Sequence, residues 1–143
     1  MDLTPVARTI FAKDIYATKV TGINIEYVDE NRTVCSMELT DIHLNAKGFV
    51  MGGAIFTLAD FAFAIAANSD IMASGQDAEL QWVSSSSTIH FLSPAKDSPL
   101  RATTTKIKQG RNQALIQISV TDSSDRQIAL VTTSGTRINS NQN

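Results

Sequence analysis

One carboxylate lies in the middle of the most apolar stretch of this chain. Residues 52–69 read GGAIFTLADFAFAIAANS, where the polar side chains besides Asp60 are Thr57, Asn68 and Ser69. Apolar residues on every side of such a segment predict a helix that is buried all round. A carboxylate in that place is costly unless it is hydrogen-bonded, paired, or partly neutralised by a raised pKa. We therefore predict a chemical role for Asp60, and a purely structural, hydrogen-bonded aspartate is the alternative.

Two glycines, Gly52 and Gly53, stand at the start of the predicted helix. The N-terminus of a helix presents unpaired backbone N–H groups and a partial positive charge, and glycine lets a ligand come close. Such an end can stabilise a developing oxyanion. The alternative is that the two glycines only allow tight packing against the sheet. The acid that follows on the same helix makes this explanation weaker.

The separation of these two features constrains any mechanism that uses both. Gly52 and Asp60 are eight residues apart, which is roughly 12 Å along one helix axis. Both cannot touch a single reacting carbonyl group from one helix. If both act, they come from different subunits, so we predict a dimer as the minimal catalytic unit.

The helix is embedded among segments that alternate apolar and polar residues. Thr4-Pro5 opens a short predicted helix at residues 4–13. A loop at 40–51 precedes the apolar helix, and a connection at 70–79 follows it. Five or six antiparallel strands are predicted, with turns at 29–31 and 110–112 and a frayed tail at 140–143; the strand segments are 23–28, 34–39, 83–94, 100–109, 114–122 and 128–138.

One long apolar helix among such strands predicts an α+β fold. Wrapping the sheet around the helix covers it on most sides, and the length of 143 residues predicts a single domain over residues 1–143. An exposed edge strand that pairs with a second copy would extend the sheet and bury the helix further. We therefore expect a homo-oligomer.

Composition narrows the class of protein. The hydrophobic fraction of 43% and charged fraction of 18% are ordinary for a soluble domain, and a net charge of −2 without a basic run argues against a nucleic-acid partner. The single cysteine, Cys35, lies in an alternating strand pattern, which indicates packing and a reducing compartment. Residues 1–19 lack the features of a secretory signal, and the apolar helix is too short and too polar at Asp60 to span a membrane. We expect a cytoplasmic protein.

Three segments carry a resemblance to a known family: HLNAKGFVMGGAIFTLADFAFAIAANS, STIHFLSPAK and KQGRNQ. Together they resemble the PaaI-type acyl-CoA thioesterases of the hotdog-fold superfamily, over about residues 23–138. The resemblance implies a hotdog fold and hydrolysis of an acyl-CoA thioester to a free acid and CoA. Coenzyme A is then part of the substrate, no separate cofactor is needed, and sites form between subunits of a dimer or a dimer of dimers.

The resemblance also implies roles for individual residues. Asp60 is the nucleophile or general base, and the backbone N–H at Gly52 polarises the thioester carbonyl. Asn45 in the preceding loop helps to place the acid or the water, and Ser84 on the strand after the helix positions the nucleophilic water. Gly53 belongs to the same substrate-binding helix start.

The chain departs from the family at Met51. These enzymes usually read His-Gly-Gly at the helix start, and methionine cannot donate the hydrogen bond of that histidine. We expect activity to be reduced or differently tuned, and an acyl-CoA-binding protein with weak or no turnover is the alternative. A hotdog dehydratase is disfavoured, because its chemistry needs a histidine at this position.

The remaining candidates concern histidines and cations. His43 and His90 have no spacing that indicates a metal site, and His90 is either an ordinary strand histidine or part of the ligand path. Cations flank the strand ends, where the family meets the phosphates of coenzyme A; they are Lys96, Lys106, Lys108 and Arg111. Lys108 and Arg111 form the favoured pair, with scattered surface charge as the alternative. The chain has no G-x-S-x-G elbow and no phosphate-binding glycine loop.

Overall fold

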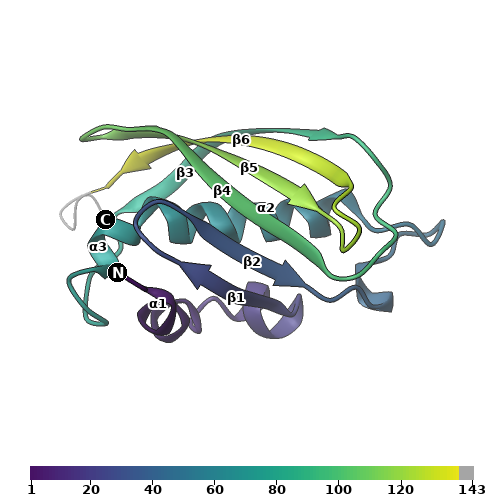
Figure 1. Cartoon of the computed structure of the whole chain (residues 1–143), viewed down its shortest axis with the longest axis horizontal. Coiled ribbons are helices and arrows are strands. Elements are labelled where there is room, and N and C mark those ends of the chain that lie inside the picture. Colours follow the sequence, from purple (N-terminus) through teal and green to yellow (C-terminus); the bar gives the residue numbers. More distant parts are fainter. Residues whose placement is uncertain (139–143) are drawn as a thin grey trace.

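The computed structural model describes residues 1–138, so the predicted frayed tail at 140–143 lies outside the described residues. Five helical elements and six strands follow one another along the chain (Figure 1). The helical elements are α1 (Thr4–Phe11), the π-helix η1 (Tyr16–Val20), the 3₁₀ helix η2 (Asp41–His43), α2 (Gly52–Ala67) and α3 (Ser69–Met72). The strands are β1 (Ile23–Val28), β2 (Thr33–Met37), β3 (Trp82–Phe91), β4 (Leu100–Gln109), β5 (Gln113–Thr121) and β6 (Gln127–Arg137).

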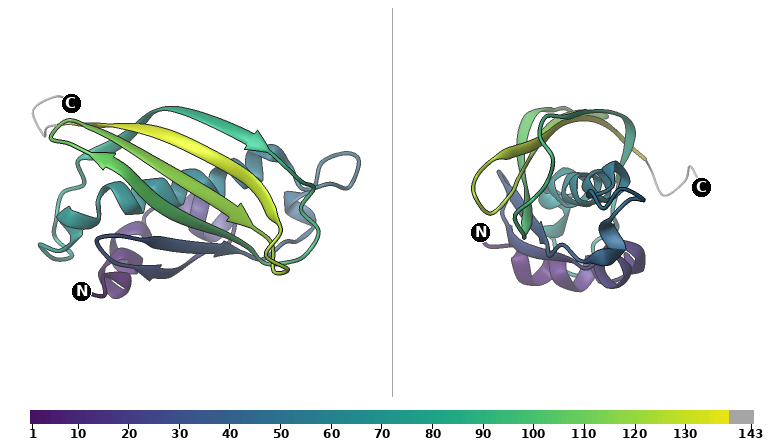
Figure 2. Two further views of the ribbon diagram at one scale, coloured as in Figure 1. Left: turned by 45° about the horizontal axis from the view of Figure 1, so that its top comes forward. Right: turned by 90° about the vertical axis from the view of Figure 1, so that its right-hand side faces the viewer.

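The strands form one antiparallel sheet that bends around α2. Its order is β1-β2-β4-β5-β6-β3, and every neighbouring pair is antiparallel. The end-on view in Figure 2 shows α2 in the hollow of the curved sheet, with the N-terminal helical segments on the side away from β5 and β6. The predicted α+β fold with a sheet around one long helix is therefore confirmed.

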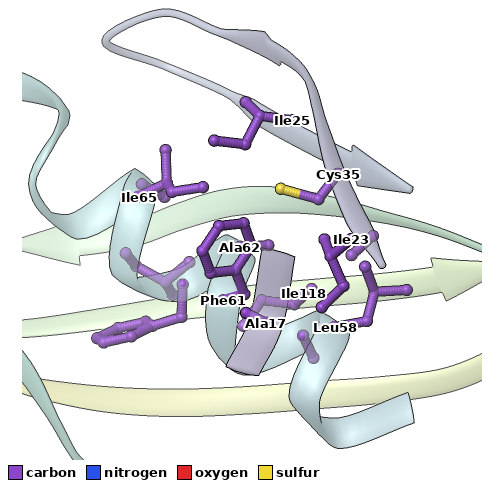
Figure 3. Close-up of a cluster of buried hydrophobic side chains, with 14 of the residues drawn as sticks. Ala17, Ile23, Ile25, Cys35, Leu58, Phe61, Ala62, Ile65 and Ile118 are labelled. Atoms are coloured by element: carbon purple, nitrogen blue, oxygen red, sulfur yellow. The ribbon is translucent and has the colours of Figure 1, made fainter. Parts of the chain in front are cut away.

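The core lies between α2 and the concave face of the sheet. Figure 3 shows Leu58, Ala62 and Ile65 of α2 beside apolar side chains of β1, β2 and β5. Cys35 belongs to this cluster and has no exposed surface, which confirms its predicted packing role. Burial raises the pKa of the Cys35 thiol to about 12, so this cysteine is not a thiolate nucleophile.

The prediction that α2 is buried all round is wrong for the single chain. Gly53 is exposed, and Thr57, Asp60 and Ala64 are only partly buried. These positions recur every three or four residues and so form one stripe along the helix. The sheet of one chain curves over the other faces of α2 and leaves this stripe uncovered.

The apolar helix also ends earlier than predicted. Asn68 separates α2 from the short helix α3, which occupies the first residues of the predicted connection 70–79. The buried Asn68 carboxamide donates to the carbonyl oxygens of Ala64 and Trp82, and its oxygen accepts from the N–H groups of Gln81 and Trp82. Asn68 thus joins the end of α2 to the start of β3, because its side chain replaces the missing helical and strand partners.

The N-terminal segment differs from its prediction as well. Helix α1 ends at Phe11, and the π-helix η1 follows before β1. Phe11 packs edge-to-face on Phe61 of α2 with ring centroids 5.8 Å apart. Residues 14–20 lack helical periodicity in the sequence, so a second helical turn here could not be read from the pattern.

Candidate active site

Asp60 lines a cavity between α2 and the N-terminal segment. The cavity has a volume of about 300 Å³ and is lined by Asp14, Ile15, Tyr16, Ala17, Thr57, Asp60, Phe61 and Ala64. The carboxylate thus lies on the uncovered stripe of α2 and faces a space that can hold a ligand or water.

The surroundings of Asp60 make it more basic than an ordinary aspartate. Burial raises the pKa of the Asp60 carboxyl, the nearby Ser84 hydroxyl opposes that rise, and the negative charge of Asp14 adds to it. The salt bridges within residues 1–138 are Met1–Glu30 and Arg101–Glu26, so no cation pairs with Asp60 there. A partly buried carboxyl with this electrostatic environment suits a general base or a nucleophile.

Ser84 reaches Asp60 because β3 is fixed to the helix at its start. Asn68 holds both backbone groups of Trp82, two residues before Ser84. The register of β3 against β6 shifts between Ser84 and Ser86, and such a bulge re-aims the side chains around it. The structure therefore brings together two predicted site residues that are 24 positions apart in the sequence. The action of Ser84 on a nucleophilic water stays a prediction.

The start of α2 forms a separate site. Met51 precedes the helix, and its N–H donates to the carbonyl oxygen of His43 at 2.8 Å. Gly52 and Gly53 open the helix, so their N–H groups have no acceptor within it. A Cβ on Gly52 would lie 2.8 Å from Cζ of Phe91, whereas a Cβ on Gly53 would meet open space. Packing therefore explains Gly52 in part, and it does not explain Gly53.

Gly52 and Asp60 do not share a cavity in one chain. Gly52 lines an apolar cavity of about 500 Å³ with Phe49, Val50, Ile55 and residues 91–95. Asp60 is absent from that lining, as Gly52 is from the other. Both residues lie on the same continuous helix, so the predicted separation of roughly 12 Å applies.

Asn45 is occupied within its own loop. Its side-chain oxygen accepts from the N–H groups of Lys47 and Phe49 at 2.9 and 3.0 Å, and the residue is exposed. It lines neither the Asp60 cavity nor the Gly52 cavity. Its predicted role in placing the acid or the water therefore stays a prediction, which requires a second subunit.

The two histidines have different surroundings. His43 is buried; its Nδ1 accepts from the N–H of Thr40, and its Nε2 donates to the carbonyl oxygen of Thr21. His43 thus holds the loop that leads to Met51. His90 is exposed on β3 opposite Leu130, and it lines neither the Asp60 nor the Gly52 cavity.

The predicted cation pair shares one hollow at the turn between β4 and β5. Lys108 and Arg111 line a cavity of about 520 Å³ together with Gly110, Asn112, Gln113, Ala114, Leu115 and Ser134. Lys106 points elsewhere: its Nζ donates to Oγ of Ser69 at 2.8 Å, and burial lowers the pKa of its ammonium group. Lys96 is exposed in the loop between β3 and β4. Lys108 and Arg111 are therefore the pair available to an anionic ligand at this turn.

Sequence reasoning missed Asp14, the second carboxylate of the Asp60 cavity. Asp14 follows Lys13 in a polar segment without periodicity, and only the path of the chain between α1 and η1 brings it to α2. A local sequence signal could not have shown this.

Residues 1–138 contain no group of three or more His, Cys, Asp or Glu side chains that could hold a metal ion. None of the helices described is long and apolar enough to cross a membrane.

The model of a family described as the thioesterase superfamily matches residues 47–129, a segment that contains the helix start, Asp60 and Ser84.

Curated relatives and solved structures agree with that match. The acyl-coenzyme A thioesterase PaaI of Escherichia coli K12 is 32% identical over 87% of this chain and 83% of its own length. A putative esterase of Deinococcus radiodurans is 29% identical over 81% of this chain and 74% of its own length. The structure of the E. coli PaaI protein superimposes with a TM-score of 0.77, covering 96% of each chain.

Proposed function

This chain belongs to the thioesterase superfamily and is a thioesterase of the hotdog fold, and we propose that it hydrolyses acyl-CoA thioesters with Asp60 as its general base or nucleophile. The products are a free acid and coenzyme A. The E. coli relative at 32% identity is named an acyl-coenzyme A thioesterase, which supports this substrate class.

The observation that carries the proposal is the setting of Asp60. Its carboxyl lines a cavity, has a raised pKa, and is not neutralised by a cation within the described residues. Ser84 supplies a hydroxyl beside it. A structural aspartate would be expected to have its oxygens saturated by backbone donors, as the oxygen of Asn68 is.

The chemistry of such a site is acyl transfer to water. As a general base, Asp60 takes a proton from water while the water oxygen bonds to the thioester carbon. The carbonyl becomes an oxyanion, and the C–S bond then breaks to release the CoA thiolate, which takes up the proton. As a nucleophile, an Asp60 oxygen bonds to the thioester carbon, and the C–S bond breaks to release the CoA thiolate and leave an anhydride. Water then hydrolyses the anhydride to the free acid and regenerates the Asp60 carboxylate, and the thiolate takes up a proton from that water.

The oxyanion needs donors that Asp60's own helix start cannot reach. We assign this role to the backbone N–H of Gly52 from a neighbouring subunit, with Gly53 beside it. Helix α2 carries the uncovered stripe, and the exposed edge strand β3 packs beside this helix. Two such faces packed antiparallel, about a two-fold axis near Thr57, would set the helix start of one chain beside Asp60 of the other.

A dimer of this kind also covers what one chain leaves open. Most of β3 is exposed, and an unpaired edge strand invites pairing with a second copy. We propose a homodimer as the catalytic unit, and two such dimers can associate further. We propose that Asn45 and His90 contact a ligand across the subunit boundary, since neither lines the Asp60 cavity or the Gly52 cavity of its own chain.

The nucleotide part of the substrate requires positive charge away from the thioester. Lys108 and Arg111 line one hollow, and such a pair binds phosphate oxygens through charge-assisted hydrogen bonds. We propose that they contact the phosphates of coenzyme A. The proposal includes a cytoplasmic location, in keeping with the single buried cysteine.

A second function is favoured by one residue. Met51 stands at the helix start with 47% of its surface exposed, where it offers no donor to a thioester. An acyl-CoA-binding protein with weak turnover would have this feature. Tight acyl-CoA binding without thiol release would favour that function, and Met51→His would then raise turnover in a manner that depends on Asp60.

The test of the leading proposal is Asp60→Asn on a panel of acyl-CoAs, with released CoA measured by a thiol reagent. The amide keeps the shape of the side chain but can neither take a proton from water nor attack a thioester efficiently. We expect a loss of kcat of about a hundredfold or more. Asp77→Asn, in the exposed connection after α3, is the matched control. Turnover of Asp60→Asn at the wild-type rate would refute the role of Asp60.

A further inference from the structure

Asp14 is a second carboxylate in the cavity of Asp60, and the mechanism above does not use it. The two residues come from separate elements: Asp60 from α2, and Asp14 from the turn between α1 and the π-helix η1. The backbone of Asp14 is fixed at both ends. Its N–H donates to the carbonyl oxygen of Phe11 at 3.0 Å, and its carbonyl oxygen accepts from the N–H and the hydroxyl of Thr18.

The side chain of Asp14 makes no hydrogen bond and no salt bridge among the described residues. The salt bridges of residues 1–138 do not include it, and the side-chain hydrogen bonds found there involve only its backbone carbonyl. Helical segments of the π type are rare and occur frequently at functional sites, and η1 begins two residues after Asp14. The turn therefore places in the lining of the Asp60 cavity a carboxylate that has no salt-bridge partner among residues 1–138.

The other charged groups nearby do not screen this pair. The ionisable side chains that line the cavity are Asp14, Asp60 and the phenol of Tyr16, and β3 adds the neutral hydroxyl of Ser84. Arg8 and Lys19 line a different cavity, on the β1 and β2 side of the N-terminal segment. Asp14 is an exposed residue whose carboxyl is only partly desolvated, which raises its pKa, and the charge of Asp14 in turn raises the pKa of Asp60.

We propose that Asp14 is a positioning residue of the thioesterase site, whose negative charge across the shared cavity makes Asp60 a stronger base. This rests on the proposed function of Asp60. A base that binds its proton more tightly removes a proton from water more readily, and the same change makes the enzyme lose activity at a higher pH on the acid side. The charge of Asp14 thus raises the rate near neutral pH and lowers the activity in acid.

The experiment compares wild type with Asp14→Asn, Asp14→Glu and the control Asp77→Asn. We expect Asp14→Asn to lower kcat near neutral pH about two- to fivefold and to move the acid limb of kcat/KM to lower pH. Asp14→Glu restores the charge and brings the limb back toward that of wild type. Asp77→Asn removes the same charge from an exposed position and leaves both quantities unchanged.

A second measurement separates this inference from the proposed function. Carboxyl ¹³C NMR follows the titration of Asp60 directly, with its signal identified by its absence from Asp60→Asn. We expect the pKa of Asp60 to fall in Asp14→Asn and not in Asp77→Asn. An unchanged Asp60 titration, or an acid limb that stays in place in Asp14→Asn, would overturn the role of Asp14. Loss of all turnover in wild type with the NMR shift intact would instead refute the thioesterase proposal and keep the coupling of the two carboxyls.

Discussion

The side chain of Asn68 pairs with the backbone of Trp82, donating to its carbonyl oxygen at 3.2 Å and accepting from its N–H at 3.0 Å. This contact joins the end of the long helix to the edge strand that carries Ser84. It fixes the position of Ser84 relative to Asp60, because α2 ends and β3 begins beside this contact.

Replacement of Asn68 by alanine should destabilise the fold. The change removes four hydrogen bonds at a residue that is 1% exposed and leaves the buried N–H of Trp82 without its partner. We expect a loss of about 2–4 kcal/mol in the free energy of unfolding, measured by urea denaturation. Asn31→Ala, at the exposed hairpin turn, is the control and should change it by less than about 0.5 kcal/mol. Equal effects of the two variants would contradict this role of Asn68.

A side chain at Gly135 should disturb the same region from the opposite strand. Gly135 of β6 pairs with Ser84, and a Cβ there would lie 2.6 Å from Cζ of Phe63, a ring that is 1% exposed. Because this ring is almost fully buried, we expect Gly135→Ala to cost about 1–3 kcal/mol. Thermal denaturation measures the loss. Gly53→Ala, whose Cβ meets open space, is the matched control, and an equally small effect at Gly135 would show that the core around Phe63 can give way.

Loss of the Ser84 hydroxyl should shift the pH dependence of activity in the direction opposite to that expected for Asp14→Asn. The hydroxyl lowers the pKa of Asp60 by stabilising its ionised form. In Ser84→Ala the pKa of Asp60 therefore rises further, and the acid limb of kcat/KM moves to higher pH. A pH–rate profile measures this, with Ser123→Ala in the exposed turn before β6 as the control. A limb that stays in place would separate Ser84 from the ionisation of Asp60.

The ionised carboxylate of Asp60 should reduce the stability of the folded protein at neutral pH. Its pKa is raised in the folded chain, so the folded state binds the proton more tightly than the unfolded state. The corresponding stability is present below the ordinary pKa of 3.8 and is lost as the pH rises through the folded value. Asp60→Asn should therefore melt at a higher temperature than wild type at pH 7, and the two curves should converge in acid. A lower melting temperature at pH 7 would instead indicate a structural aspartate.

Removal of the cation pair should weaken recognition of the nucleotide alone. We expect Lys108→Ala with Arg111→Ala to raise KM for an acyl-CoA about tenfold and to leave kcat nearly unchanged, because both groups act at a distance from the thioester. The corresponding acyl-pantetheine, which lacks the nucleotide, should show no change in KM. Lys47→Ala, on the exposed loop before α2, is the control. A rise in KM for both substrates would place the pair elsewhere.

Much of the architecture could be predicted because it rests on local patterns. Strands β1 and β4 match their predicted bounds, and the other strands differ by one to three residues at their ends. Alternation of apolar residues is a property of each segment by itself, and so is the apolar character of α2. The end of α2 was predicted too late because Asn68 acts through Trp82, which is distant in the sequence.

From the residues themselves, the candidate site was predictable only where they carry their own signal, and Ser84 was predicted from the family resemblance instead. Asp60 stands out as an acid in an apolar run, and the glycine pair stands out at a helix start. Asp14 has neither kind of signal, and it became visible only when the turn before η1 was found beside α2. Asn45 and Gly52 lie outside the Asp60 cavity of their own chain, which agrees with the sequence argument that one helix cannot supply both groups.

The sequence by itself determined that an acid and a helix N-terminus occur on one apolar helix inside an antiparallel sheet, since helical rise and residue polarity are local properties. The tertiary structure alone decided which surface of that helix stays uncovered, that Ser84 lies beside Asp60, and that a second carboxylate shares their cavity. These depend on contacts between segments that are far apart along the chain. Burial and the charges of neighbours, which set the basicity of Asp60, exist only once those segments have packed.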